Sequence, residues 1–414
     1  MRTRDCATCR PLFLHVIVIV VTASLLVTPR IVSGQDGDPQ ALRQELDQLR
    51  TEFETLREEY EARLAALEAR LVALRPGQAE PPQAPPQAVP AGGGQVFNPD
   101  MSVIANVEGA AGRNELTDQP SLSLSEVETA LQAVVDPYAR ADFFLSATPE
   151  GLEVEEGYIT FTTLPAGVLV KAGKMREQFG KVNTLHTHAL PWTDLPLVSQ
   201  NLVGGEEALA DAGVSVSKLI PNGFMFLDAL GEVYRGDSDT FSTSSRSRLQ
   251  YIGRLRGYRD LTEGTNVDLG VSYANGPSAE ISDFTKQLVG IDATFRYRPL
   301  RRAIYRQFVG RTELVWSRQD LPAGTSQGAF GFFSSGDYQF ARRWFAGVRG
   351  DRSGRVLDGT LHDSGVSLAL TFRPSEFSLF RGQYRHTRYA EGVTANEVLF
   401  QLNFSIGAHG AHPF

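Results

Sequence analysis

The chain has 414 residues, 42% of them hydrophobic, and a formal net charge of −8. This length is enough for one large domain and an appendage. Beyond residue 30 no run of about 18 apolar residues occurs, which excludes a bundle of transmembrane helices. It does not exclude a β-barrel, whose strands are apolar on one face only. The acidic charge argues against a nucleic-acid partner.

Residues 1–34 have the pattern of a secretory signal peptide. Three arginines begin the segment, Leu12–Val27 is apolar, and small residues precede Gln35. A retained anchor helix is the alternative interpretation. Cleavage would remove both cysteines, Cys6 and Cys9, so the mature chain would form no disulfide. Cleavage would also remove four arginines and one aspartate, leaving 36 basic and 47 acidic residues and a charge of −11.

Two segments are expected between the signal peptide and the main domain. Residues 35–75 predict a periplasmic α-helical coiled coil, because apolar residues recur at alternating spacings of four and three between charged positions. One stutter interrupts this pattern at Tyr60. A single amphipathic helix lying on the main domain is the alternative. Residues 76–96 predict a linker, stiff where it is proline-rich and flexible at Gly92–Gly94. The coiled-coil positions are Leu42, Leu46, Leu49, Phe53, Leu56, Tyr60, Leu64, Leu67, Leu71 and Leu74.

Residues 97–414 are expected to be all-β. Apolar residues alternate with polar or small residues over 266–273, 289–298 and 397–406. Period-2 alternation with one apolar face is the signature of barrel strands. Soluble β-sandwiches show the same alternation, so this pattern by itself leaves the two fold classes open.

The spacing of the connections favours a barrel. About 16 strands of roughly ten residues fit the chain, the length that crosses a bilayer at a tilt. Every second connection is short and rich in turn-forming residues, and the connections between them are mostly longer and polar. Short turns on one rim and long loops on the other are typical of bacterial outer-membrane barrels, with the short turns in the periplasm. The predicted short turns are Asp136-Pro137, Leu164-Pro165-Ala166-Gly167, Pro221-Asn222-Gly223, Arg298-Pro299 and Arg373-Pro374-Ser375.

Aromatic residues gather near these turns and are expected to form a girdle at the membrane interface. Ordinary core packing is the alternative for any one of them. The chain ends in Phe414, which resembles the signal read by the barrel assembly machinery. The expected partners are therefore outer-membrane lipid and this machinery. The girdle residues are Tyr138, Tyr305, Phe308, Trp344 and Phe377.

The longest connection, at about 175–208, is the third loop on the outer rim. It is predicted to narrow the pore, with Trp192 and prolines that suit an ordered loop. His186 and His188 could bind a metal with Asp194, because residues two apart on an extended segment point to one side. Histidines paired within the loop are the favoured interpretation, and no metal ligand is assigned; His409 and His412 are treated the same way. The predicted constriction residues are Lys181, His186, His188, Asp194, Glu206 and Glu207.

Arginines fall on the polar faces of several predicted strands and are expected to line a water-filled pore. Acidic residues share these faces: Glu126, Glu128, Asp268, Asp292 and Glu313. The alternative is that these charges pair with one another and stiffen the barrel wall. The predicted pore-lining arginines are Arg248, Arg254, Arg256, Arg296, Arg311, Arg349, Arg381 and Arg385.

An outer-membrane enzyme is not expected. His386 is accompanied by serines and aspartates elsewhere in the chain, but no motif marks a nucleophile and its base. No cofactor is expected either.

Several stretches resemble barrels related to the phosphate-selective porin O and P family. They are Phe97–Ile104, Val135–Ala139, Glu155–Ile159, Lys171–Arg176, Phe179–Lys181 and the His-Thr-His segment. The resemblance implies a 16-stranded trimeric pore without catalysis. Phosphate pores of the family use a lysine- and arginine-rich path, of which Lys171, Lys174, Arg176 and Lys181 are the nearest local equivalent. Lys171, Lys174 and Arg176 are therefore also predicted to line the pore.

Together these features predict a porin-like channel in the outer membrane of a Gram-negative-type bacterium. Small hydrophilic solutes, with anions as candidates, would diffuse through it passively. Two alternatives stay open. One is a structural tether that holds the barrel to the cell wall through the coiled coil, and the other is a metal-related outer-membrane receptor.

Overall fold

The computed structural model describes residues 99–117, 119–205 and 208–407. The predicted signal peptide, coiled coil and linker lie outside this part of the chain, as do Glu206, Glu207, His409, His412 and Phe414. None of the helices among the described residues is long and apolar enough to cross a membrane.

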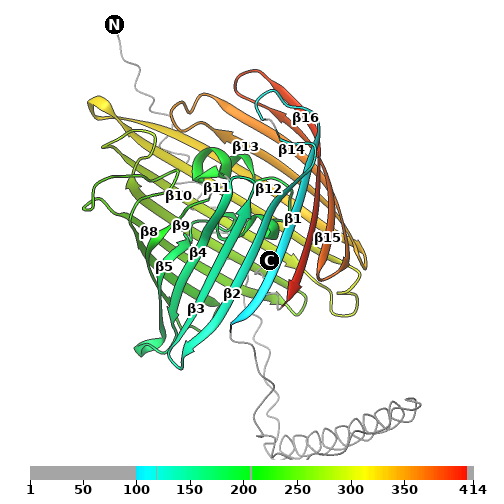
Figure 1. Ribbon diagram of the computed structural model, residues 1–414, viewed down its shortest axis with the longest axis horizontal. Coiled ribbons are helices and arrows are strands. Elements are labelled where there is room, and N and C mark those ends of the chain that lie inside the picture. The colour runs from blue at the N-terminus through cyan, green and yellow to red at the C-terminus, as the bar shows by residue number, and fades with distance from the viewer. Residues whose placement is uncertain (1–98, 118, 206–207, 408–414) are drawn as a thin grey trace, which may run out of the picture. The chain divides into compact units, whose positions relative to one another are not determined.

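Sixteen strands form one closed antiparallel barrel in which neighbours in sequence are neighbours in space (Figure 1). The first strand closes the barrel by pairing with the last, from Ser102 opposite Gly407 to Arg113 opposite Asn396. The predicted fold and the predicted number of strands are confirmed. The strands are β1 (Asp100–Arg113), β2 (Ser123–Asp136), β3 (Ala139–Thr148), β4 (Gly151–Phe161), β5 (Val168–Arg176), β6 (Ala210–Leu219), β7 (Phe226–Tyr234), β8 (Gln250–Thr262), β9 (Thr265–Pro277), β10 (Thr285–Tyr297), β11 (Gln307–Leu321), β12 (Thr325–Ala341), β13 (Trp344–Gly354), β14 (His362–Ser375), β15 (Ser378–Arg388) and β16 (Thr394–Gly407).

The alternation seen in the sequence separates the two faces of the barrel wall. On β16, Val398 and Phe404 are exposed on the outside, whereas Glu397 and Gln401 are buried inside. β9 and β10 follow the same rule. An outer face that exposes apolar side chains on strand after strand is unfavourable in water and favourable in lipid, so the barrel is transmembrane.

The short turns lie at the rim where β1 begins and β16 ends. Four of the five predicted turns connect strands as expected. The fifth prediction is wrong by two residues, because β14 continues to Ser375 and the turn is formed by 376–377. The pairing of β14 with β15 is irregular after Phe372, and such an irregularity accommodates Pro374 within a strand. On the opposite rim most connections are longer, and the shortest are 149–150 and 322–324, where the short 3₁₀ turn η6 (Pro322–Gly324) lies.

Exposed aromatic residues mark the short-turn rim. Tyr138, Tyr305, Trp344 and Phe377 are all exposed on the barrel surface. Phe308 is half-buried because its ring lies 6.3 Å from that of Phe295 on the neighbouring strand. This arrangement is the one that amphipathic rings adopt at a membrane interface.

Candidate functional site

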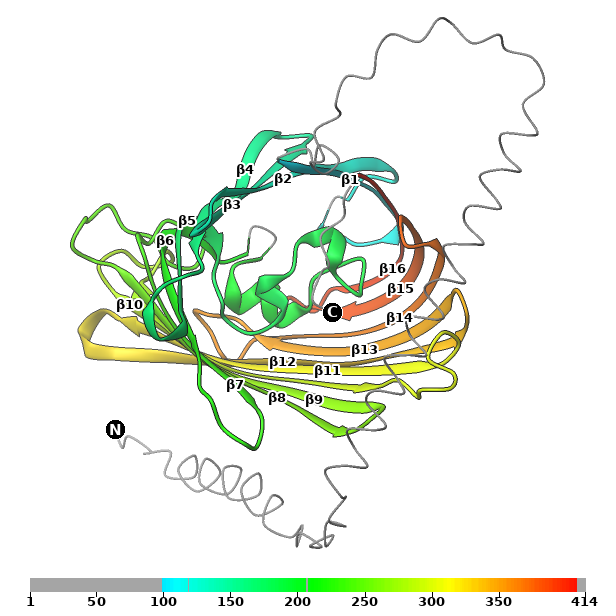
Figure 2. The same cartoon turned by 90° about the horizontal axis from the view of Figure 1, so that it is seen from below.

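The segment between β5 and β6 lies inside the ring of strands (Figure 2). We call residues 177–209 the inner loop; the sequence placed it at about 175–208, and Met175 and Arg176 instead complete β5. Among its described residues are three short helical turns, η2 (Val182–Thr184), η3 (Thr187–Ala189) and η4 (Ser199–Val203). Its contacts, described next, reach strands from β2 to β15, so it crosses the interior of the barrel.

The inner loop enters the barrel through a turn at Gly180. Gly180 has φ +60°, a left-handed conformation that favours glycine, and its N–H donates to Ser272 at 3.1 Å. The next two N–H groups, of Lys181 and Val182, donate to the buried carboxylate of Glu313 at 3.0 and 3.2 Å. Arg254 donates to the carbonyl of Gly180. Side chains from β8, β9 and β11 therefore satisfy the backbone of this turn.

Farther along, the loop is fixed through Asp194. Its carboxylate accepts hydrogen bonds from Arg349 on β13 and Arg385 on β15, each at 2.9 Å, and from Gln383. Burial would raise the pKa of Asp194, but the charges of Arg349 and Arg385 outweigh burial and hold this pKa below its usual range. An ionised Asp194 therefore joins the loop to two strands of the wall.

Backbone and side-chain hydrogen bonds continue this connection. Arg381 donates to the carbonyl of Leu190 at 3.1 Å, and Asn201 donates to Asp363 at 2.7 Å. These bonds satisfy polar groups that would otherwise be buried without partners. The inner loop is thus held to β13, β14 and β15 as well as to the strands around its entry turn.

Apolar side chains of the loop pack on an apolar part of the inner wall. Trp192 is buried against Phe333, with ring centroids 5.1 Å apart in an edge-on arrangement. Phe179 and Val198 pack where glycines leave room, since a Cβ at Gly290 would lie 3.0 Å from Phe179. The wall contributes Ile252, Ala274, Leu288, Val315, Ala329 and Phe333.

Sequence reasoning missed these inward apolar residues. Leu288-Val289, Leu314-Val315 and Phe332-Phe333 are apolar on both faces of a strand, which breaks the alternation expected for a barrel whose interior faces water. This break in the alternation indicates a part of the barrel wall whose inner face is covered. The acids predicted to face inward, in contrast, are all buried as expected.

A cavity of about 450 Å³ remains beside the inner loop. It reaches from residues near the short turns, such as Ser102 and Asp228, to Lys181 and His186 of the loop. Five basic residues line it, Lys171, Arg176, Lys181, Arg254 and Arg256, together with the acids Glu128, Glu156, Asp228 and Glu232. With His186 as a sixth basic residue, the cavity is polar and carries more basic than acidic groups.

Most of the basic groups at the cavity are paired. Lys181 and Arg256 both bind Asp268, at 2.8 and 2.7 Å, and Arg254 binds Asp292 at 3.0 Å. Lys171 differs, because within the described part of the chain it forms no salt bridge and its ammonium instead lies over the Tyr158 ring, 4.5 Å from the centroid. Among the basic residues that line this cavity, Lys171 is therefore the one whose positive charge is least neutralised by neighbouring acids.

The structure divides the predicted pore-lining residues into groups. Lys171, Arg176, Arg254 and Arg256 line the cavity, and Arg349, Arg381 and Arg385 contact the inner loop, as Arg254 also does. Arg296 lies 4.0 Å from Asp268 on the same inner wall, and Arg311 binds Asp337 at 2.5 Å. Many of the predicted pore-lining residues therefore pair with acidic residues along the barrel wall, as the alternative interpretation of the sequence has it.

Two of these residues lie elsewhere than predicted. Lys174 takes the opposite face of β5 from Lys171, because the two are three positions apart, an odd number, on a strand of period two. Its ammonium binds Glu153 and the carbonyl of Val154, each at 2.8 Å. Arg248 precedes β8 and lies in the loop from β7, where it binds Asp283 at 3.3 Å. The prediction extends the alternation of β8 to Arg248, which lies before the first residue of that strand.

The two histidines of the loop lie together but away from Asp194. Their ring centroids are 5.7 Å apart, and the segment between them is the turn η3 rather than the extended segment expected. His186 contacts glutamates of β2 and β4, whereas Asp194 contacts arginines of β13 and β15. His186, His188 and Asp194 therefore do not come together in one metal site.

The electrostatics of His186 follow from its glutamate neighbours. Burial lowers the pKa of an imidazole, but the hydrogen bonds with Glu128, Glu155 and Glu156 outweigh burial and hold the pKa of His186 well above its usual range. In the absence of another cation, His186 is thus a charged group inside the barrel.

Comparison with solved structures shows barrels of the same fold. An anion-selective porin from Comamonas acidovorans is 10% identical, with a TM-score of 0.54 over 74% of this chain and 99% of that chain. OprB of Pseudomonas putida is 11% identical, with a TM-score of 0.54 over 74% and 94%. OmpT of Vibrio cholerae, in a trimer form, is 10% identical, with a TM-score of 0.52 over 74% and 99%.

Sequence comparison gives a nearer relative. No protein-family model matches the chain. An uncharacterized protein of Aquifex aeolicus (strain VF5) is 30% identical over 362 residues, which cover 76% of this chain and 75% of the relative. At this identity and coverage, the chain belongs to the same protein family as the Aquifex aeolicus protein.

Proposed function

We propose that this protein is a porin-like channel of the outer membrane, through which small hydrophilic solutes diffuse passively. The observation that carries the proposal is the polar cavity that remains between the inner loop and the barrel wall. A transmembrane barrel with a charged interior is the arrangement of water-filled pores. The inner loop would set the width of the pore, because it fills the other part of the lumen.

The balance of charge supports a weak preference for anions. Counted with His186, six basic residues face four acidic residues at the cavity, and Lys171 is not neutralised by a salt bridge. Asp228 on β7 is the acidic counterpart, since it lines the same cavity without a salt bridge among the described residues. The resemblance to the phosphate-selective porins agrees with this direction, and phosphate itself is one candidate solute.

Conductance and reversal potential in planar bilayers test the proposal. We expect ion-conducting steps from the purified protein, and opposite changes in selectivity from Lys171→Gln, toward cations, and Asp228→Asn, toward anions. A unit charge about 7 Å from an ion in water is worth roughly 0.6 kcal/mol, or about threefold in relative permeability. Lys218→Gln is the matched control, because Lys218 is exposed and alternates with Ser217 of the cavity. A folded protein without conductance would contradict the proposal.

We also propose that the barrels assemble as homotrimers, with the coiled coil of residues 35–75 in the periplasm. The support is the heptad pattern of the sequence and the trimer form of Vibrio cholerae OmpT, which has the same fold. Deleting residues 35–96 should lower the fraction of trimer, measured by analytical ultracentrifugation in detergent. If the deletion leaves both the oligomeric state and the association with cell wall unchanged, neither trimerisation nor tethering depends on this segment.

A further inference from the structure

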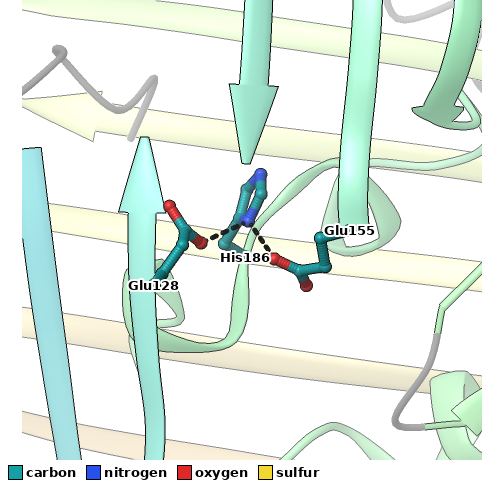
Figure 3. Close-up of side chains that lie close together, drawn as sticks. All are labelled: Glu128, Glu155 and His186. Carbon is teal, nitrogen blue, oxygen red and sulfur yellow. Dashed lines mark hydrogen bonds and ion pairs between the residues drawn. The ribbon is translucent and has the colours of Figure 1, made fainter. Parts of the chain in front are cut away.

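The imidazole of His186 lies among three carboxylates, and Figure 3 draws two of them, those of Glu128 and Glu155. Its Nδ1 lies 2.8 Å from an oxygen of Glu128 and 2.9 Å from an oxygen of Glu155. On the other side of the ring, its Nε2 lies 2.8 Å from an oxygen of Glu156. We call these residues, with the adjacent Glu126, the glutamate–histidine cluster.

A β-bulge brings two consecutive glutamates into the cluster. Successive residues of a regular strand point to opposite faces. On β4, however, Glu156 pairs with Phe144 and Val154 pairs with Leu145, so Glu155 is an extra residue without a partner on β3. Bulges of this kind redirect side chains and are frequent beside functional sites. Here the bulge lets Glu155 and Glu156 approach the same imidazole.

The cluster has more acceptor oxygens than hydrogens to satisfy them. An imidazole nitrogen carries at most one hydrogen. Since two carboxylate oxygens lie within 2.9 Å of Nδ1, one of them receives no hydrogen from it. Glu126 adds a further buried oxygen: its Oε1 accepts from Ser146 at 3.0 Å, while its Oε2 has no hydrogen-bond partner among the described residues.

The charges of the cluster are also out of balance. Four carboxyl groups, those of Glu126, Glu128, Glu155 and Glu156, lie around one imidazole and one guanidinium, those of His186 and Arg176. Arg176 binds Glu155 through its guanidinium and Glu156 through its backbone N–H. Acidic groups therefore outnumber basic groups in the cluster, and a divalent cation would offset this difference.

We infer that the glutamate–histidine cluster is a binding site for a divalent transition-metal ion. The ligands are His186 Nδ1 and oxygens of Glu128 and Glu155, which all lie within 4.8 Å of one another. Glu156 accepts the Nε2–H and so directs the lone pair of Nδ1 toward the two carboxylates. A carboxylate behind a metal-binding histidine is a recurrent feature of protein metal sites.

The chemistry of the ligands sets the class of metal. Histidine with two carboxylates suits Zn²⁺ and its first-row neighbours, whereas Mg²⁺ and Ca²⁺ prefer oxygen ligands alone. Access is from the lumen, because Glu128, Glu156 and His186 line the cavity. The site goes beyond the proposed channel, since it would hold a metal whether or not the barrel conducts ions.

Metal binding to the full barrel in detergent, purified without a histidine tag and stripped with a chelator, tests the inference. We expect calorimetric titration with ZnCl₂ to show one bound ion per chain, and MgCl₂ to show none. His186→Gln and Glu128→Gln should each weaken Zn²⁺ binding by about tenfold or more. His362→Gln, an exposed histidine at the start of β14, is the matched control and should bind as the wild type does.

Folding of each variant is checked by the shift in gel mobility on heating and by circular dichroism. Should either ligand variant not fold, the visible spectrum of Co²⁺ bound to the wild type decides, since nitrogen and oxygen ligands give d–d bands without thiolate charge transfer. A wild-type barrel that binds no Zn²⁺ or Co²⁺ overturns the inference. So does Zn²⁺ binding that persists in folded His186→Gln and Glu128→Gln, or that His362→Gln removes.

Discussion

Asp194→Asn should release the inner loop from the far wall of the barrel. Asparagine keeps the shape of the side chain but cannot balance Arg349 and Arg385, which lie 2.9 Å from the carboxylate. Removing one partner from a buried ion pair costs roughly 3 kcal/mol. The loss should be at the lower end of such values, because Arg349 keeps Asp351 and Arg385 keeps Glu397.

The released loop should widen the pore, so we expect single-channel conductance to rise by roughly twofold and to fluctuate more between levels. Chemical unfolding in detergent should show the lower stability. Asp320→Asn is the matched control, because Asp320 pairs with Arg318 at 3.7 Å on the partly exposed end of β11 and has no contact with the loop among the described residues. Unchanged conductance in folded Asp194→Asn would mean that Asp194 does not position the loop.

Lowering the pH should weaken the same contact between Asp194 and its two arginines. An acid whose pKa is lowered by folding contributes stability that is complete above its unfolded pKa, about 3.9 for aspartate, and is lost as the pH falls through the lower folded pKa. The pKa of Asp194 is lowered in this way, by Arg349 and Arg385 acting against burial. Wild-type conductance should therefore begin to rise below about pH 4, and Asp194→Asn should lack this part of the response.

Gly180→Ala should disrupt the entry turn of the inner loop. A Cβ at Gly180 would collide with the carboxylate of Glu313, which is buried and held by the N–H groups of Lys181 and Val182. Glu313 can move aside only by giving up these hydrogen bonds. Leaving a buried carboxylate without such partners costs about 1–3 kcal/mol, in addition to the strain of the left-handed backbone.

Gly167→Ala separates the collision from the backbone strain. Gly167 has φ +67°, close to the value at Gly180, but a Cβ there would meet nothing within 4 Å. Its neighbour Ala166 already adopts φ +62°, so alanine is tolerated in this conformation in an exposed turn. Gly167→Ala should therefore cost only about 1 kcal/mol. In urea unfolding, the stability of Gly180→Ala should be well below that of Gly167→Ala. Equal losses of stability in the two variants would show that the contact with Glu313 does not contribute.

The sequence by itself determined the barrel. Alternation of apolar and polar residues is a local property with a period of two, and turn-forming residues limit each strand, so sixteen strands could be counted without knowing their partners. The turn at Arg373–Ser375 was misplaced because a strand irregularity depends on pairing with β15. The same local pattern identified the long third loop and the inward acids.

Only the tertiary structure decided what the inward charges do. Arg254 and Arg349 look alike in the sequence, but one lines the cavity and the other holds Asp194, because the inner loop covers one side of the lumen. The cluster at His186 depends on a bulge at Glu155 and on a loop brought back from beyond β5 to lie against β2. The partners of His186 and Asp194 lie on distant strands of the barrel rather than nearby in the chain. The alternation within a strand gives no information about these partners. They come together only when the barrel closes and the inner loop enters it.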